Sequence, residues 1–265
     1  MSSRARGIVS SPASGARVQA CTYAPPPDLS DVVESFWVGR WDLRGQPPHV
    51  TELLGDPAVH IVAEAGASRV VGVWTRRWVR RLEGRGLVRA AKLRPGAVGA
   101  LFDGPAIALT DQLNAFGPTW GTDAEAFERR ILQPRDDEEA FVFLADWIRR
   151  RRRPDPRGMQ RAIEVCASLG EPDVWAGASA LAARSGMEVR TMQRMFRAHV
   201  GASPKTLLRR ARLQEGIGRL ESGAVPSLAG LALDLGYADQ AHFSRDVKAV
   251  IGKTPRQLRA LLRAT

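Results

Sequence analysis

The sequence predicts an α+β fold, with a small β-barrel domain and accompanying helices first and an all-α domain after it. Three observations support this prediction. Short β-leaning runs separated by Gly and Pro fill much of residues 21–122. Two amphipathic helical patterns, each after a short turn containing Gly, follow residue 177. Of the net charge of +11, residues 155–265 carry +7, with 17 Lys and Arg against 10 Asp and Glu.

Four segments are expected along the 265 residues, a length typical of one or two domains. Residues 1–20 are expected to form a mobile tail. Residues 21–122 are expected to form a β-rich domain for sensing or assembly. Residues 123–153 are expected to form a helical connector, and residues 154–265 the all-α domain.

Several sequence features indicate a cytoplasmic protein. The chain has no run of 18 apolar residues, so we expect no membrane segment. Residues 1–17 lack the continuous apolar stretch of a secretory signal. Cys21 and Cys166 provide neither a disulfide framework nor a metal-binding spacing.

The β-rich domain is predicted from runs whose length and spacing suit a small barrel or sandwich. Residues 31–41 fit either a strand or a short helix, and further strands are expected at 58–62, 69–74, 78–82 and 87–93. Six of the seven tryptophans precede residue 154. Trp stacks on planar ligands and donates a hydrogen bond, so Trp37, Trp74 and Trp78 are candidates to line an effector pocket. The alternative is that these rings fill the barrel core.

The connector is predicted to hold two helices interrupted at Pro134. The acidic residues 136–139 would lie at the start of the second helix, where the helix dipole favours negative charge. The helices either mediate dimer contacts or pack on the barrel. Five consecutive arginines, 149–153, precede Pro154 and Pro156 and mark a boundary of mutually repelling charges.

The first helix-turn-helix pattern occupies residues 178–199. Residues 178–184 fit a short helix, and Gly186 can adopt the positive φ that the following turn needs. In the next helix Val189, Met192, Phe196 and Val200 share one side. The other side carries Arg190, Gln193, Arg194 and Arg197, without a carboxylate. Guanidinium and carboxamide groups match base edges in the DNA major groove, although an ordinary solvated face would look the same.

A second such pattern occupies residues 228–251. Ser227 can cap a helix over 228–235, Gly236 can turn the chain, and Asp239 can cap a helix that begins at Gln240. Phe243, Val247 and Val250 face inward, whereas Ala241, Ser244, Arg245 and Lys248 face outward, with His242 at the flank. Ser203 and Pro204 start a linker helix that runs to about residue 221. The two outward-facing helices could enter successive major grooves, roughly 34 Å apart.

Residues 157–265 resemble the C-terminal DNA-binding domain of the AraC/XylS family of bacterial transcription regulators. The matching pieces are L-A-A-R-S-G-M, Q-R-M-F, G-A-S-P, L-G-Y-A-D-Q-A-H-F-S-R and G-K-T-P-R. The resemblance implies two helix-turn-helix units on a linker helix. It also implies base contacts from Arg190, Gln193 and Arg194 in the first unit and from Gln240, Ala241, His242, Ser244 and Arg245 in the second. We expect phosphate contacts from Arg197, Lys205, Arg209, Lys248 and Lys253.

The chain departs from the family pattern at several positions. Glu188 stands where Ser or Thr is usual, which exchanges a strong cap for a favourable charge. Gly216 and Gly218 are expected to weaken the linker helix by about 1 kcal/mol each relative to Ala. Val247 replaces a common aromatic residue, and Ala241 cannot hydrogen-bond a base. Base reading is therefore expected mainly from the first unit.

The N-terminal half weakly resembles the cupin-like sensing domain of one branch of the same family, in residues 92–98 and the following L-F-D-G-P-A-I-A-L-T-D-Q-L. A cupin-type metal enzyme is an alternative, since His49, Glu52 and His60 lie in the β region. The sequence lacks the H-x-H and Glu spacing of cupin metal sites and the common nucleotide-binding and hydrolase motifs. A DNA-repair methyltransferase would need acceptor and metal cysteines that Cys21 and Cys166 do not provide.

These observations predict a sequence-specific transcription regulator, more often an activator in this family, rather than an enzyme. Its expected partner is double-stranded DNA at an operator or promoter, and no cofactor is expected. The family resemblance adds RNA polymerase as a partner and leaves open a small-molecule effector and a homodimer. Residues 149–153 would be a solvated linker or would contact DNA phosphates. A nonspecific DNA-binding protein is the remaining alternative.

Overall fold

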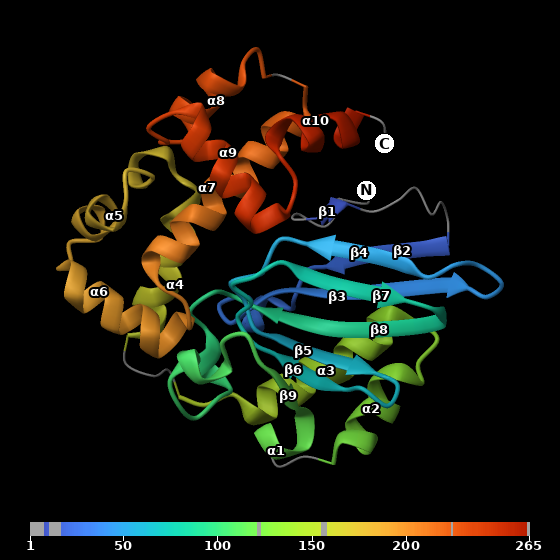
Figure 1. Cartoon of the computed structure of the whole chain (residues 1–265). Coiled ribbons are helices and arrows are strands. Elements are labelled where there is room, and N and C mark those ends of the chain that lie inside the picture. Colours follow the sequence, from blue (N-terminus) through green and yellow to red (C-terminus); the bar gives the residue numbers. More distant parts are fainter. Residues whose placement is uncertain (1–7, 11–16, 121–122, 155–157, 224, 264–265) are drawn as a thin grey trace.

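The computed structural model describes residues 8–10, 17–120, 123–154, 158–223 and 225–263. In these ranges the N-terminal half forms two antiparallel sheets (Figure 1). The larger sheet has the order β2 (Val18–Tyr23), β3 (Val33–Leu43), β8 (Gly84–Leu93), β5 (His60–Glu64), β6 (Arg69–Val71) and β9 (Leu113–Ala115). The smaller sheet has the order β1 (Ile8–Ser10), β4 (His49–Leu53) and β7 (Trp78–Leu82). The structure thus has the mixed fold class that the sequence predicts.

The expected mobile tail is wrong for the part that the structure describes. Ile8 and Ser10 pair with β4, and Val18, Gln19 and Ala20 pair with β3. Most side chains of β2 are exposed, so this strand lacks the apolar alternation by which a half-buried strand is detected. Its backbone hydrogen bonds to β3 fix it instead. Residues 1–7 and 11–16 lie outside the described residues.

The larger sheet separates two layers of packing. Phe36 of β3 stacks on Phe141 of α3 (Asp137–Arg151) at 5.1 Å between ring centroids, and α2 (Ala124–Leu132) packs beside it. The opposite face carries a small separate apolar cluster of Val62, Val88 and Ala90, against which Trp37 and Trp41 pack. The smaller sheet lies on that side, because Arg80 of β7 sits 5.2 Å from the Trp41 ring and pairs with Glu64. The helices of the connector therefore pack on the sheet of their own chain.

A buried charge cluster fixes the start of α3. The Arg89 side chain is only 1% exposed and donates to Asp137 and to the backbone oxygens of Ile131 and Pro134. Burial tends to raise the pKa of the Asp137 carboxyl, but hydrogen bonds from Arg40, Tyr23 and Arg89 outweigh it, and the pKa is lowered. Asp136 caps the helix by accepting from the Glu138 N–H.

Most of the arginine run at the end of α3 is held by contacts within the chain. Four of its members have partners: Arg149 pairs with Asp28 and Asp146, Arg152 with Asp31 and Arg153 with Asp103, and Arg151 lies over the Trp147 ring. The expectation of a mutually repelling linker is therefore wrong for Arg149, Arg152 and Arg153. Carboxylates far away in sequence, which the local pattern did not include, hold them against the N-terminal domain.

The all-α domain consists of two three-helix units at the ends of one long helix, α7 (Figure 1). The first unit has α4 (Met159–Ala167), α5 (Ala178–Arg184) and α6 (Val189–Met195), which continues as one π-helical turn, Phe196–Val200. The linker helix α7 spans Pro204–Glu221. The second unit has α8 (Leu228–Asp234), α9 (Gln240–Ile251) and α10 (Pro255–Arg263). The expected helix positions in both units and the linker are confirmed.

The two glycines of α7 differ in their surroundings. A Cβ at Gly216 would lie 2.9 Å from the Leu235 side chain and 3.5 Å from Phe243, whereas a Cβ at Gly218 would meet nothing within 4 Å. Gly216 thus lets the second unit approach the linker helix closely. The sequence predicted only that both glycines weaken the linker helix, and it did not indicate the packing role of Gly216.

The remaining described elements are short. They are α1 (Phe116–Trp120) and 3-10 turns at Pro27–Leu29, Val98–Ala100, Ala106–Leu109, Ser168–Gly170 and Pro172–Val174. Among the described residues, no helix combines the length and the apolar character needed to span a bilayer.

Candidate nucleic-acid interface

The two helix-turn-helix units contain the same turn. In the first, Gly186 has φ +60°, its N–H donates to Ala183, and the Met187 N–H donates to Ala182 at 2.9 Å. In the second, Gly236 has φ +73°, its N–H donates to Leu233, and the Tyr237 N–H donates to Ala232 at 2.9 Å. Only Gly adopts this positive φ without steric cost. The sequence therefore builds one structural unit twice, at a spacing of 50 residues.

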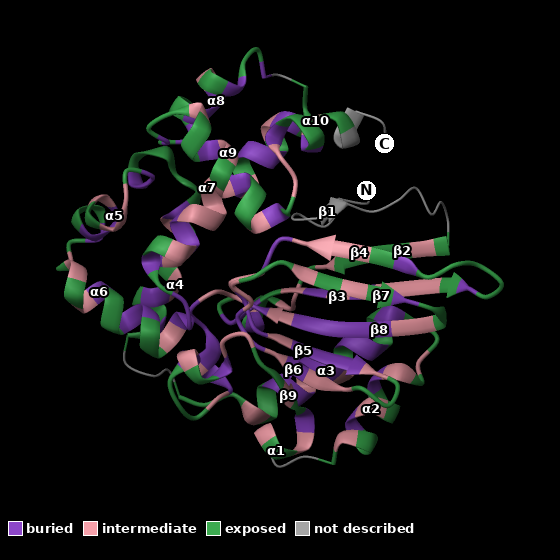
Figure 2. Ribbon diagram, in the orientation of Figure 1, coloured by how far each residue is buried: buried purple, intermediate pink, exposed green. Residues whose placement is uncertain are grey.

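The first unit presents a cationic helix face. Met192 and Phe196 are fully buried and anchor α6 and the turn that follows it. Arg190, Gln193, Arg194 and Arg197 are exposed on the other side, as the alternating colours along α6 indicate (Figure 2). Together with Glu188 and Thr191 they line one open surface depression. Among the described residues, none of these three arginines takes part in an ion pair, so their guanidinium groups face solvent.

The start of α6 lacks the usual cap. The Glu188 side chain accepts no hydrogen bond from the first turn, although its backbone has the extended conformation of a capping residue. In the second unit Ser227 accepts from the Gly230 N–H at 2.9 Å, and Asp239 accepts from the His242 N–H at 2.6 Å. The caps that the sequence predicts at Ser227 and Asp239 are confirmed.

The second unit presents a less open face. Ala241, His242, Arg245 and Lys248 are exposed on α9, whereas Gln240 and Ser244 are half-buried. His242 packs its ring edge-on to Tyr237 at 5.1 Å. Asp246 accepts a hydrogen bond from the Tyr237 hydroxyl at 3.1 Å. It also pairs with Arg209 of α7 at 2.8 Å. The polar groups of α9 are thus partly used inside the domain.

The residues expected at DNA phosphates fall into two groups. Arg197, Lys205 and Lys248 are exposed. Arg209 is bound to Asp246, and Lys253 pairs with Glu52 of β4 at 3.0 Å. In this structure the last two cations therefore already have carboxylate partners.

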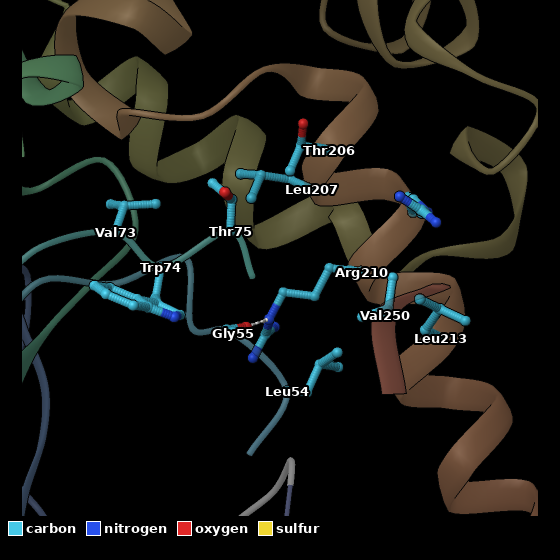
Figure 3. A pocket seen from close by; sticks show the side chains of 11 residues that line it. Leu54, Gly55, Val73, Trp74, Thr75, Thr206, Leu207, Arg210, Leu213 and Val250 are labelled. Atoms are coloured by element: carbon cyan, nitrogen blue, oxygen red, sulfur yellow. Dashed lines mark hydrogen bonds between the residues drawn. The ribbon is translucent and has the colours of Figure 1, made fainter. Parts of the chain in front are cut away.

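A small cavity separates the two halves of the chain (Figure 3). Leu54, Val73 and Trp74 line it from the sheet side, and Leu207 and Leu213 line it from α7. Arg210 reaches across it and donates to the Gly55 carbonyl. Burial lowers the pKa of the Arg210 guanidinium, and the nearby Asp56 and Glu34 oppose that shift. Local sequence patterns did not indicate a role for Arg210, because its partner lies 155 positions away.

Of the three candidate pocket tryptophans, Trp74 and Trp78 contact each other, whereas Trp37 contacts a different set of residues. Trp74 lines the cavity at α7 and packs edge-on against Trp78 at 4.7 Å. Trp37 lies between the two sheets and donates to His60 Nδ1 at 3.0 Å. His60 Nε2 is 3.4 Å from Asp56, which also pairs with Lys92. Trp37 therefore belongs to a chain of polar contacts between the two sheets.

Two of the candidate metal ligands, Glu52 and His60, form ion pairs and hydrogen bonds with other side chains. Glu52 pairs with Lys253 and Arg77, and His60 with Trp37 and Asp56. The described residues contain no group of three or more His, Cys, Asp or Glu side chains that could hold a metal ion. Cys21 is exposed, and burial raises the pKa of the Cys166 thiol to about 12.

Comparison with known families matches both halves of the chain. Residues 181–261 match the family described as "Helix-turn-helix domain", and residues 21–114 match "Domain of unknown function (DUF6597)". The chain is similar to the HTH-type transcriptional activator RhaS of Pectobacterium carotovorum subsp. carotovorum, with 33% identity over 79 residues. It is also similar to RhaS of Pectobacterium atrosepticum, with 32% identity over 85 residues. These matches cover 30% and 32% of the chain but only 28% and 29% of the relatives.

Solved structures of ToxT from Vibrio cholerae O395 also align with the chain. One has a TM-score of 0.39 and 10% identity, and the alignment covers 83% of this chain and 98% of ToxT.

Proposed function

We propose that this chain, whose C-terminal part belongs to the helix-turn-helix domain family and is of the AraC/XylS type, is a sequence-specific regulator of transcription. The observation that carries the proposal is the repeated unit. Two identical turns, each followed by a helix with exposed cationic groups, lie at the two ends of α7. One rigid helix between two such units suits two neighbouring grooves of the same duplex.

In this mechanism α6 and α9 enter successive major grooves. Arg190, Gln193 and Arg194 contact base edges in one groove, because their side chains are exposed and match guanine and adenine. Gln240, His242, Ser244 and Arg245 contact the other groove. The exposed cations Arg197, Lys205 and Lys248 contact phosphates and fix the register of the protein on DNA.

The remaining parts of the proposal rest on similarity. The relatives are transcriptional activators, which supports activation of transcription. The family resemblance alone suggests RNA polymerase as the partner and the cytoplasm as the location. The N-terminal sheets are proposed to bind a small-molecule effector or a second copy of the chain, and the domain boundary is proposed near residue 154. We assign the chain no enzymatic activity, since its similarity is to regulators.

Selection of binding sites from random DNA with the full chain tests the proposal. We expect enrichment of a two-part motif whose halves are separated by one helical turn, about 10–10.5 base pairs. Recovery of unrelated sequences, bound with equal affinity, would instead identify a nonspecific DNA-coating protein.

A further inference from the structure

The second helix-turn-helix unit is attached to the N-terminal sheet at the C-terminal end of α9. Lys253 lies two residues after the end of α9, and its ammonium group lies 3.0 Å from Glu52 Oε2. Arg77 lies 3.3 Å from Glu52 Oε1 and donates to the Ile251 carbonyl at 3.4 Å. A cation is favoured at this place because Ile251 ends α9, where the helix dipole is negative. Glu52 and Arg77 thus bind the same helix end from the sheet.

A second contact holds the same segment of the sheet domain. Gly55, three residues after Glu52, accepts from Arg210 in the middle of α7. Asp56 beside it pairs with Lys92 at 3.1 Å, which ties the segment into the larger sheet. The segment 52–56 therefore contacts both the linker helix and the end of α9.

We propose that Glu52 acts as an internal substitute for a DNA phosphate, holding Lys253 on the N-terminal sheet until an effector releases it. This inference rests on the proposed function. The carboxylate and a phosphate oxygen compete for one ammonium group, so docking of the second unit and full DNA contact exclude each other at this residue. In the first unit no acidic side chain pairs with Arg190, Arg194 or Arg197 among the described residues, so the restraint acts on the second unit.

The variant Glu52→Gln tests this inference in the full chain. It keeps the size of the side chain and removes its charge. Because ion pairs that remain partly open to solvent are weak, we expect DNA affinity to rise only about two- to five-fold. The slope of log K against log salt should become steeper by about 0.9, the value for one added phosphate contact.

Glu83→Gln is the matched control. Glu83 is exposed and pairs with Arg81 of β7, and removal of its charge changes the net charge equally. We expect it to leave the salt slope unchanged. Equal effects of Glu52→Gln and Glu83→Gln would overturn the proposal, because they would reflect net charge alone.

Lys253→Ala completes the cycle. It should change the DNA affinity of the unaltered chain little. In the Glu52→Gln background it should abolish the gain in DNA affinity. An equal loss of DNA affinity in the unaltered chain and in the Glu52→Gln variant would show that Lys253 already contacts DNA. That result would refute the restraint. Thermal melting of each variant verifies folding. If the unaltered chain bound no DNA at all, the proposed function would fail instead.

Discussion

Helices α6 and α9, which we propose to contact bases, differ in how strongly the rest of the chain restrains them. The cationic face of α6 has no ion-pair partner among the described residues and points to solvent. The polar side of α9 is partly occupied, since Asp246 binds Arg209 and Tyr237 and the helix end binds Arg77. Two units with the same turn therefore have different surroundings.

This difference separates two tasks. A side chain that reads bases must be exposed and must not lose another strong contact when it binds DNA. Arg190 and Arg194 satisfy this condition. A helix that responds to the N-terminal domain must contact it, and α9 does so through Ile251 and the adjacent Lys253. The first unit is thus suited to base recognition and the second to regulation.

The largest expected effect comes from Arg194→Ala in the first unit. Loss of a bidentate base contact should cost about 1–3 kcal/mol on the selected site and relax base preference there. Ser244→Ala in the second unit should cost less, because Ser244 is half-buried. Binding titrations on selected and random DNA measure both. Equal losses on both DNAs for Arg194→Ala would assign Arg194 to the phosphates.

The caps provide the next contrast. Asp239→Ala removes the hydrogen bond to His242 N–H and should lower the free energy of unfolding by about 1 kcal/mol. Glu188→Ser should raise the free energy of unfolding, because the Glu188 side chain makes no capping hydrogen bond and Ser can make one. Calorimetric melting temperatures provide the measurement. A destabilised Glu188→Ser variant would contradict the cap assignment.

The linker glycines form a matched pair. Gly218→Ala should raise the free energy of unfolding by about 0.5–1 kcal/mol, since its Cβ meets open space. Gly216→Ala should gain nothing or lose stability, because its Cβ would lie 2.9 Å from Leu235. Chemical denaturation of both variants makes the comparison. Equal stabilisation would mean that the second unit packs less closely on α7 than the structure indicates.

The smallest expected effect concerns phosphate contacts near the start of α7. Lys205→Ala should weaken binding to all DNA sequences and flatten the salt slope by about 0.9. Arg209→Ala should flatten it less, because Arg209 already pairs with Asp246 at 2.8 Å. Titrations at several salt concentrations measure both slopes. An equal change for the two variants would mean that DNA displaces Asp246 from Arg209.

Local sequence patterns predicted the helical half closely. Helix α5 and the start of α7 occur at the predicted residues, and Ser203, Ser227 and Asp239 cap their helices as expected. The strands were predicted less well. The run at 58–62 is shifted to β5, His60–Glu64, and β2 and β4 were not predicted as strands. A helix leaves a periodic pattern within a few residues, whereas a strand depends on partners elsewhere in the chain.

The sequence by itself determined the repeated unit, because turns, caps and amphipathic faces involve residues no more than five or so positions apart. Only the tertiary structure decided which charges remain available to DNA. Lys253 and Glu52 are 201 positions apart, and Arg149 and Asp28 are 121 positions apart. A cationic residue looks the same in the sequence whether it faces solvent or a carboxylate of another domain. Coulombic pairing depends on distance in space, and folding alone sets that distance.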